Sequence, residues 1–118
     1  MIAVVAGHSH NTQITPYPGP DGFGFWEIKS PAVADWPTQN RVIEVMDNKD
    51  GTLSIFGTMA DHAGPVVAPP AGDPSDFSTA ELAAVGRTIA WNDPQNGPNG
   101  AQGNPTDRNV ELLIKDPR

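Results

Sequence analysis

Apolar residues in the first quarter of the chain follow two patterns that predict strands. Residues Ile2–Ala6 form a continuous apolar run rich in β-branched side chains, which is typical of a strand covered on both faces. The segment FGFWEIKS alternates instead, with Phe23 and Phe25 on one side of an extended chain and Trp26 and Ile28 on the other. Both sides carry large apolar residues, so we expect both faces of this second strand to be covered as well.

Two more strand-like runs, Arg41–Met46 and Thr52–Met59, are separated by the sequence DNKDG. A short stretch of Asp, Asn and Gly between two such runs predicts a β-hairpin, in which Gly51 takes the position that needs a positive φ. DNKDG also resembles the start of a calcium-binding loop, but Thr58 stands where such a loop closes with an acidic residue. A hairpin turn is therefore the interpretation that we adopt.

A helix is predicted to begin after Ser78. Ser78 and Glu81 have the spacing of a capping box, and Phe77 and Leu82 have that of a hydrophobic staple. The helical pattern continues through ELAAVGRTIAW and stops at the sequence NDP. The apolar stripe that we expect to face the core consists of Leu82, Val85 and Ile89.

The remaining segments carry turn and loop signals. The prolines of TPYPGPDG predict a loop, and residues 61–77 and 94–108 predict irregular connections. The apolar segment NVELLI near the C-terminus predicts a short edge strand or a docking segment. Together these elements predict a single domain over residues 1–118 of the α+β class, with mostly antiparallel strands and one helix in the C-terminal half.

The composition narrows the classes of partner. The 118 residues include 12 Gly and 13 Pro, so we expect much of the chain in turns and loops. The net charge is -7 and the seven Lys and Arg form no cluster, which argues against nucleic acid or an anionic membrane as a partner. No stretch reaches the ~20 apolar residues of a membrane span. The chain has no cysteine, which excludes disulfides and thiolate metal sites.

The sequence Gly-His-Ser-His at positions 7–10, directly after the first strand, is the strongest candidate for chemistry. In a chain that leaves the strand extended, residues two apart project to the same side, so His8 and His10 present both imidazoles to one spot. Imidazole is a common ligand of zinc, manganese, iron and nickel, so the pair predicts half of a metal site. The alternative is a pair of histidines that are hydrogen-bonded at the edge of a loop.

These residues resemble a known family. VVAGHSHNTQI is similar to the last metal-binding motif of the calcineurin-like metallophosphoesterases, in which a strand is followed by Gly-His-x-His. The segment GFWEIKSPAVADWPTQNRVIEVMDNKDGTLSIFGTMADH and the tail DRNVEL resemble the C-terminal portion of an actinobacterial-type branch of that superfamily. The resemblance covers nearly the whole chain.

The resemblance implies the C-terminal part of a four-layer αββα sandwich that hydrolyses a phosphate ester with two divalent metal ions, Mn, Fe or Zn. In that arrangement His8 binds one ion and His10 the other. The family's earlier Asp-x-His, Gly-Asp and Gly-Asn-His motifs have no counterpart before Gly7, and two imidazoles supply no bridging carboxylate. We therefore expect a partial domain that is inactive alone, binds metal weakly or not at all, and requires a missing N-terminal half or self-associates.

A second hypothesis comes from another class of protein. The chain would then be a non-catalytic binding or interaction domain, in which the Gly-His-Ser-His loop is structural or holds a single ion. Other conspicuous residues have structural interpretations: His62 matches no ligand motif, and the three tryptophans are typical of packing. Arg41 lies close enough in the sequence to pair with Asp35 or Glu44.

Overall fold

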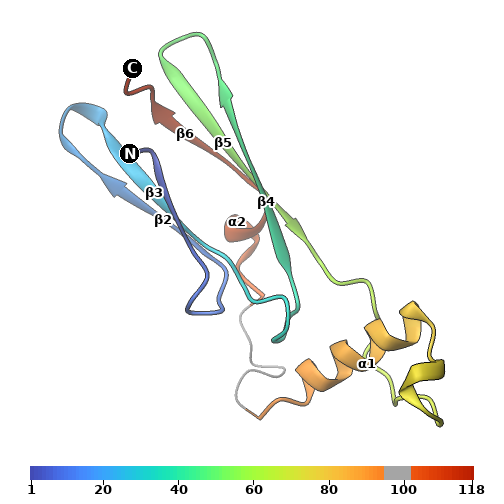
Figure 1. Ribbon diagram of the computed structural model, residues 1–118. Helices are drawn as coiled ribbons and strands as arrows, with labels where there is room; N and C mark the ends of the chain where they lie inside the picture. The colour runs from blue at the N-terminus through green and yellow to red at the C-terminus, as the bar shows by residue number, and fades with distance from the viewer. Residues whose placement is uncertain (95–101) are drawn as a thin grey trace.

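The computed structural model describes residues 1–94 and 102–118, which form two three-stranded sheets and one main helix (Figure 1). The strands are β1 (Ala3–Ala6), β2 (Gln13–Pro18), β3 (Gly24–Lys29), β4 (Asn40–Asp47), β5 (Thr52–Ala60) and β6 (Val110–Lys115). The helices are α1 (Thr79–Trp91) and the single turn α2 (Pro105–Arg108), with 3-10 turns at Pro20–Gly22 and Pro74–Asp76. The expected α+β class, with mostly antiparallel strands and one long helix, is confirmed.

The first sheet has the order β1-β3-β2, so β3 is its central strand. It runs parallel to β1 and antiparallel to β2. The alternation of β3 is confirmed: the ring of Phe25 stacks on that of Tyr17, and Ile28 is fully buried in the core. The expectation that the first strand is covered on both faces is wrong, because β1 lies at the sheet edge and the side chain of Val5 is 57% exposed.

The proline-rich segment that we expected to be a loop is in part a strand. Pro16 and Pro18 belong to β2, which pairs with β3 from Gln13 opposite Lys29 to Pro18 opposite Gly24. Proline has no backbone N–H to donate, and an edge strand such as β2 tolerates this loss on its outer side. The loop itself is confined to the residues between Pro18 and Gly24.

The second sheet has the order β4-β5-β6 and contains the predicted hairpin. Gly51 has a φ of 88°, as the turn requires. The carboxylate of Asp47 accepts a hydrogen bond from the N–H of Lys49, and that of Asp50 accepts one from the N–H of Thr52. These bonds close the DNKDG turn. NVELLI forms the edge strand β6, which pairs antiparallel with β5.

The two sheets lie side by side (Figure 1) and enclose one apolar core. Its buried members come from both sheets: Ile28, Leu53, Ile55, Leu112 and Ile114. The indole N–H of Trp26 on β3 donates to the carbonyl oxygen of Leu113 on β6 at 3.0 Å. This bond links the two sheets and satisfies the indole of Trp26, in agreement with the packing role expected for the tryptophans.

Helix α1 begins and ends as predicted, but it buries a different face. Its capping box is present, and Asn92 caps its C-terminus. Leu82 is 47% exposed and Ile89 is 67% exposed, so the predicted apolar stripe is wrong. The buried residues are Ala84, Thr88 and Ala90. The reason is that α1 packs on loop segments through small side chains: the hydroxyl of Thr88 accepts from the N–H of Val67 and donates to its carbonyl oxygen.

The two predicted connections differ in structure. Residues 61–77 are irregular apart from the 3-10 turn at Pro74–Asp76. In the connection 94–108, residues 95–101 lie outside the described part of the chain, but Pro105–Arg108 is helical where we expected no regular structure. Tertiary contact stabilises this turn, because the buried carboxylate of Asp107 accepts a hydrogen bond from the N–H of Ile14 at 2.9 Å.

The fold is elongated. It measures 61 × 27 × 20 Å and has a radius of gyration of 18.0 Å, whereas a compact chain of this length has a value of roughly 13 to 14 Å. Helix α1 lies beyond one end of the paired sheets, and the hairpin tips and both termini lie towards the other end (Figure 1). The core between the sheets is therefore separate from the packing around α1.

Candidate metal site after β1

The chain reverses immediately after β1. The N–H of His10 donates to the carbonyl oxygen of Gly7 at 3.4 Å, and His10 has a φ of 50°. The expectation of an extended exit from the strand is therefore wrong, because the chain turns here to enter β2. The two histidines still lie two positions apart in one exposed turn, residues 7–10, which we call the histidine turn.

The two imidazoles have different surroundings. His8 is exposed, and its side chain has no hydrogen bond or ion pair within the described part of the chain. Nδ1 of His10 pairs with a carboxylate oxygen of Asp35. Between them, the hydroxyl of Ser9 donates to the side-chain oxygen of Asn11 at 2.8 Å.

The parallel pairing of β1 with β3 explains why His10 meets Asp35. Parallel strands end at the same edge of a sheet, so the segment after β1 and the segment after β3 lie together. The N–H of Ser30 donates to the carbonyl oxygen of Ala6 at 2.8 Å and continues the pairing beyond β3. Asp35 follows five residues later and reaches the histidine turn from this side. The sequence contains no local signal for this pairing.

Helix α1 supports the loop that carries Asp35. Trp36 is 6% exposed, and its ring packs edge-on against that of Trp91, with a centroid separation of 4.6 Å. The guanidinium of Arg87 lies 4.4 Å from the centre of the Trp36 ring and donates to the carbonyl oxygen of Pro37 at 2.6 Å. The residue next to Asp35 is thus fixed between two side chains of α1.

The donor set fits part of a metal centre. Within residues 1–94 and 102–118, no group of three or more His, Asp and Glu side chains is arranged to hold a metal ion. Both nitrogens of His8 are accessible, and the contact of His10 Nδ1 with Asp35 leaves its Nε2 available for a ligand. The turn therefore carries two exposed imidazoles, and any further ligands of a metal centre must come from outside it.

Two other polar residues singled out in the sequence are structural. Nδ1 of His62 accepts a hydrogen bond from the N–H of Gly64 at 2.9 Å, as a structural role requires. The expectation that Arg41 pairs with Asp35 or Glu44 is wrong, because its guanidinium donates to the carbonyl oxygens of Asp107 and Arg108. The helical turn that carries these carbonyls was not predicted, so the sequence offered no partner of this kind.

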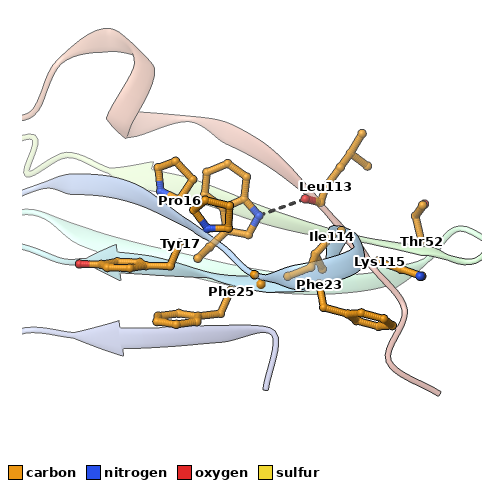
Figure 2. A pocket seen from close by; sticks show the side chains of 13 residues that line it. Pro16, Tyr17, Phe23, Phe25, Thr52, Leu113, Ile114 and Lys115 are labelled. Atoms are coloured by element: carbon orange, nitrogen blue, oxygen red, sulfur yellow. Dashed lines mark hydrogen bonds between the residues drawn. The ribbon is translucent and has the colours of Figure 1, made fainter.

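Two clefts accompany these features. One, of about 570 Å³, lies beside the candidate site and is lined by Asp35 and by the C-terminal end of α1, including Ile89 and Asn92. The other, of about 380 Å³, lies near the tip of the β2–β3 hairpin, at the opposite end of the first sheet from the histidine turn. Figure 2 shows the parallel rings of Tyr17 and Phe25 along this second cleft. The sequence did not predict it, because its walls come from both sheets.

Comparison of the chain with models of known protein families, with curated proteins and with solved structures finds no match. Among the described residues, no helix is both long enough and apolar enough to cross a membrane.

Proposed function

We propose that the chain is the C-terminal part of a calcineurin-like metallophosphoesterase and that His8 and His10 are two of its metal ligands. The observation that carries the proposal is the histidine turn at the end of β1. Both imidazoles are exposed there, and that of His10 is paired with a carboxylate through one nitrogen. The resemblance of the surrounding sequence to that family supplies the reaction class.

The proposed reaction is hydrolysis of a phosphate ester at a centre of two divalent ions, Mn, Fe or Zn. When bound, such ions supply positive charge that stabilises the phosphate oxygens during displacement. This chain contributes His8 to one ion and His10 to the other. The remaining ligands, a carboxylate among them, would come from a separate N-terminal part. The net charge of -7 is compatible with an anionic substrate once metal ions bring the opposite charge.

A second candidate function is that of a non-catalytic binding domain. The observation that favours it is the cleft near the hairpin tip, where Tyr17 stacks on Phe25 and the ammonium of Lys115 lies 4.1 Å from the centre of the Phe23 ring. Apolar and aromatic walls of this kind are typical of ligand sites. In that case the histidine turn is structural or holds a single ion.

Hydrolysis assays separate the two functions. We expect the isolated chain, with manganese or zinc supplied, to cleave aryl phosphate mono- or diesters no faster than the metal alone. Joined to an N-terminal part that bears the Asp-x-His, Gly-Asp and Gly-Asn-His motifs, it becomes active. When several groups act together in catalysis, removal of any one of them costs the enzyme nearly all of its activity. His8→Ala or His10→Ala is therefore expected to abolish turnover by the joined protein.

The matched control is His62→Ala. It removes an imidazole that lies outside the histidine turn and accepts one backbone hydrogen bond, from Gly64. This variant retains the activity of the joined protein. An active joined protein that is indifferent to His8→Ala and His10→Ala would exclude the proposed ligands. Turnover by the isolated chain that depends on either histidine would show that the site is complete within these residues.

A further inference from the structure

The carboxylate of Asp35 contacts Nδ1 of the His10 imidazole. A carboxylate accepts hydrogen bonds and has none to donate when ionised, so the ring nitrogen that faces it carries the proton. The other nitrogen, Nε2, then bears the lone pair. We infer that Asp35 is a positioning residue that holds His10 in this tautomer and aims Nε2 at a divalent metal ion. The inference rests on the proposed metal function of the histidine turn.

Both partners of this contact are held in place. The backbone of the Asp35 loop is closed by a hydrogen bond from the N–H of Thr38 to the carbonyl oxygen of Asp35 at 2.6 Å. Trp36 is fixed between Trp91 and Arg87 of α1. On the other side, the turn that carries His10 is closed by its own backbone hydrogen bond to Gly7. The backbone on both sides of the contact is therefore fixed.

A carboxylate contact of this kind affects how tightly a histidine binds a metal ion. A histidine that binds a metal commonly donates its other N–H to a carboxylate, which fixes the ring and makes the ligating nitrogen more basic. Loss of such a partner typically weakens metal binding about 10- to 100-fold. His8 has no such partner within the described residues. Asp35 therefore acts on one of the two ligands alone.

The tautomers of the three histidines provide the first test, by long-range ¹H–¹⁵N correlation spectra of the isolated chain at a pH where all three rings are neutral. We expect His10 to carry its proton on Nδ1. His62 is the internal reference with the opposite tautomer, because its Nδ1 accepts a hydrogen bond from Gly64. In Asp35→Ala the Nδ1–H form of His10 is lost, and an unchanged His62 signal shows that the fold persists.

Zinc affinity provides the second test, from the shifts of the His8 and His10 signals on titration with zinc. Asp35→Ala weakens binding about tenfold or more. Asp35→Asn keeps an oxygen that accepts the hydrogen bond but removes the charge, so it retains the tautomer and has an intermediate affinity. The charge-matched control is Asp21→Asn, at the opposite end of the first sheet, which leaves the affinity unchanged.

Two results would overturn the inference: a His10 ring protonated on Nε2 in the unsubstituted chain, or an Asp35→Ala variant with unchanged tautomer and zinc affinity. The failure of the proposed function has a different signature. If His10 shows the expected tautomer and loses it in Asp35→Ala, but His8→Ala and His10→Ala leave the activity of the joined protein unchanged, then Asp35 orients the ring and the metal function is wrong.

Discussion

Arg41 joins β4 to α2 through a guanidinium that is almost fully buried. Nη2 donates to the carbonyl oxygen of Asp107 at 2.6 Å, and Nη1 donates to that of Arg108 at 3.0 Å. Burial removes water from the cation and lowers the pKa of Arg41, although the nearby carboxylate of Asp107 opposes this shift. The guanidinium thus satisfies carbonyl groups at the C-terminal end of α2, which have no partner within so short a helix.

Replacement of this residue is expected to destabilise the fold. Arg41→Met keeps most of the apolar stem but leaves two carbonyl groups without their donors. Each buried polar group without a partner costs about 1 to 3 kcal/mol, so the loss of two donors is expected to lower the free energy of unfolding by roughly 2 to 6 kcal/mol. Urea denaturation measures this change. The control is Arg118→Met, whose ion pairs are exposed to solvent and contribute little to stability. Equal losses in both variants would contradict the role of Arg41.

For individual residues, the sequence was informative where the partner of a side chain lies within a few positions along the chain. The backbone bond to His62 comes from two residues further along the chain. The partners of Arg41 and Asp35 come instead from 66 and 25 residues away in the sequence, where chain pairing brings them. Arg41 binds carbonyl oxygens, which every residue has, so no side chain in the sequence marks them as its partners.

Helix α1 depends on the capping box at its N-terminus. The hydroxyl of Ser78 accepts from the N–H of Glu81, and the carboxylate of Glu81 accepts from the N–H of Ser78 at 2.8 Å. The hydrogen bonds from Ser78 hold the pKa of Glu81 below its ordinary value of 4.5. Because the folded pKa is the lower one, this stabilisation is present above the unfolded pKa and is lost as the pH falls through the folded pKa.

The cap therefore makes the stability of α1 depend on pH in acid solution. Ser78→Ala is expected to destabilise the helix by about 1 kcal/mol near neutral pH. Glu81→Gln keeps a side chain that completes the box but does not titrate. We expect amide exchange in α1 to accelerate as the pH is lowered through the acidic range in the native chain, relative to intrinsic rates, and less so in Glu81→Gln. An identical pH dependence in the two proteins would count against this assignment.

Elements with local signals were predicted well, whereas strand β2 and the buried face of α1, which depend on their position in the fold, were not. The capping box and the DNKDG hairpin are encoded within a few residues. Strand β2 was missed because its prolines argue against a strand, whereas an edge position makes them tolerable. The buried face of α1 was mistaken because the helix packs on loops around Val67 and Trp36 and not on the sheets.

Several large apolar residues are exposed in the described part of the molecule. Val5 on β1 and Val42, Val45 and Met46 on β4 are exposed, as are Leu82 and Ile89 on α1. Strands β1 and β4 are also edge strands of their sheets. Exposed apolar patches and open strand edges are common sites of association. The elongated shape leaves these surfaces uncovered by the described part of the chain.

We expect the isolated chain to self-associate, mainly through these edges. Val5→Lys and Val45→Lys place a charge on each open strand, which opposes edge-to-edge pairing, and should reduce association. Val33→Lys is the matched control, since Val33 is exposed in a loop outside the sheets. Sedimentation velocity over a range of concentrations measures the effect. A monomer at all concentrations would contradict the expectation, and so would an equal response to all three substitutions.

The proposed function requires the histidine turn to bind a divalent metal ion. Manganese titration of the isolated chain, followed through the paramagnetic broadening of the three histidine side-chain signals, tests this directly. Two ligands without further preset geometry bind weakly, so we predict selective broadening of His8 and His10 with micromolar affinity at best, while His62 remains sharp. Backbone amide signals of the turn, such as those of Ser9 and Asn11, broaden as well, and this broadening disappears when His8→Ala and His10→Ala are combined. Broadening that is equal at His62, or nanomolar binding that survives the loss of both histidines, would contradict the account.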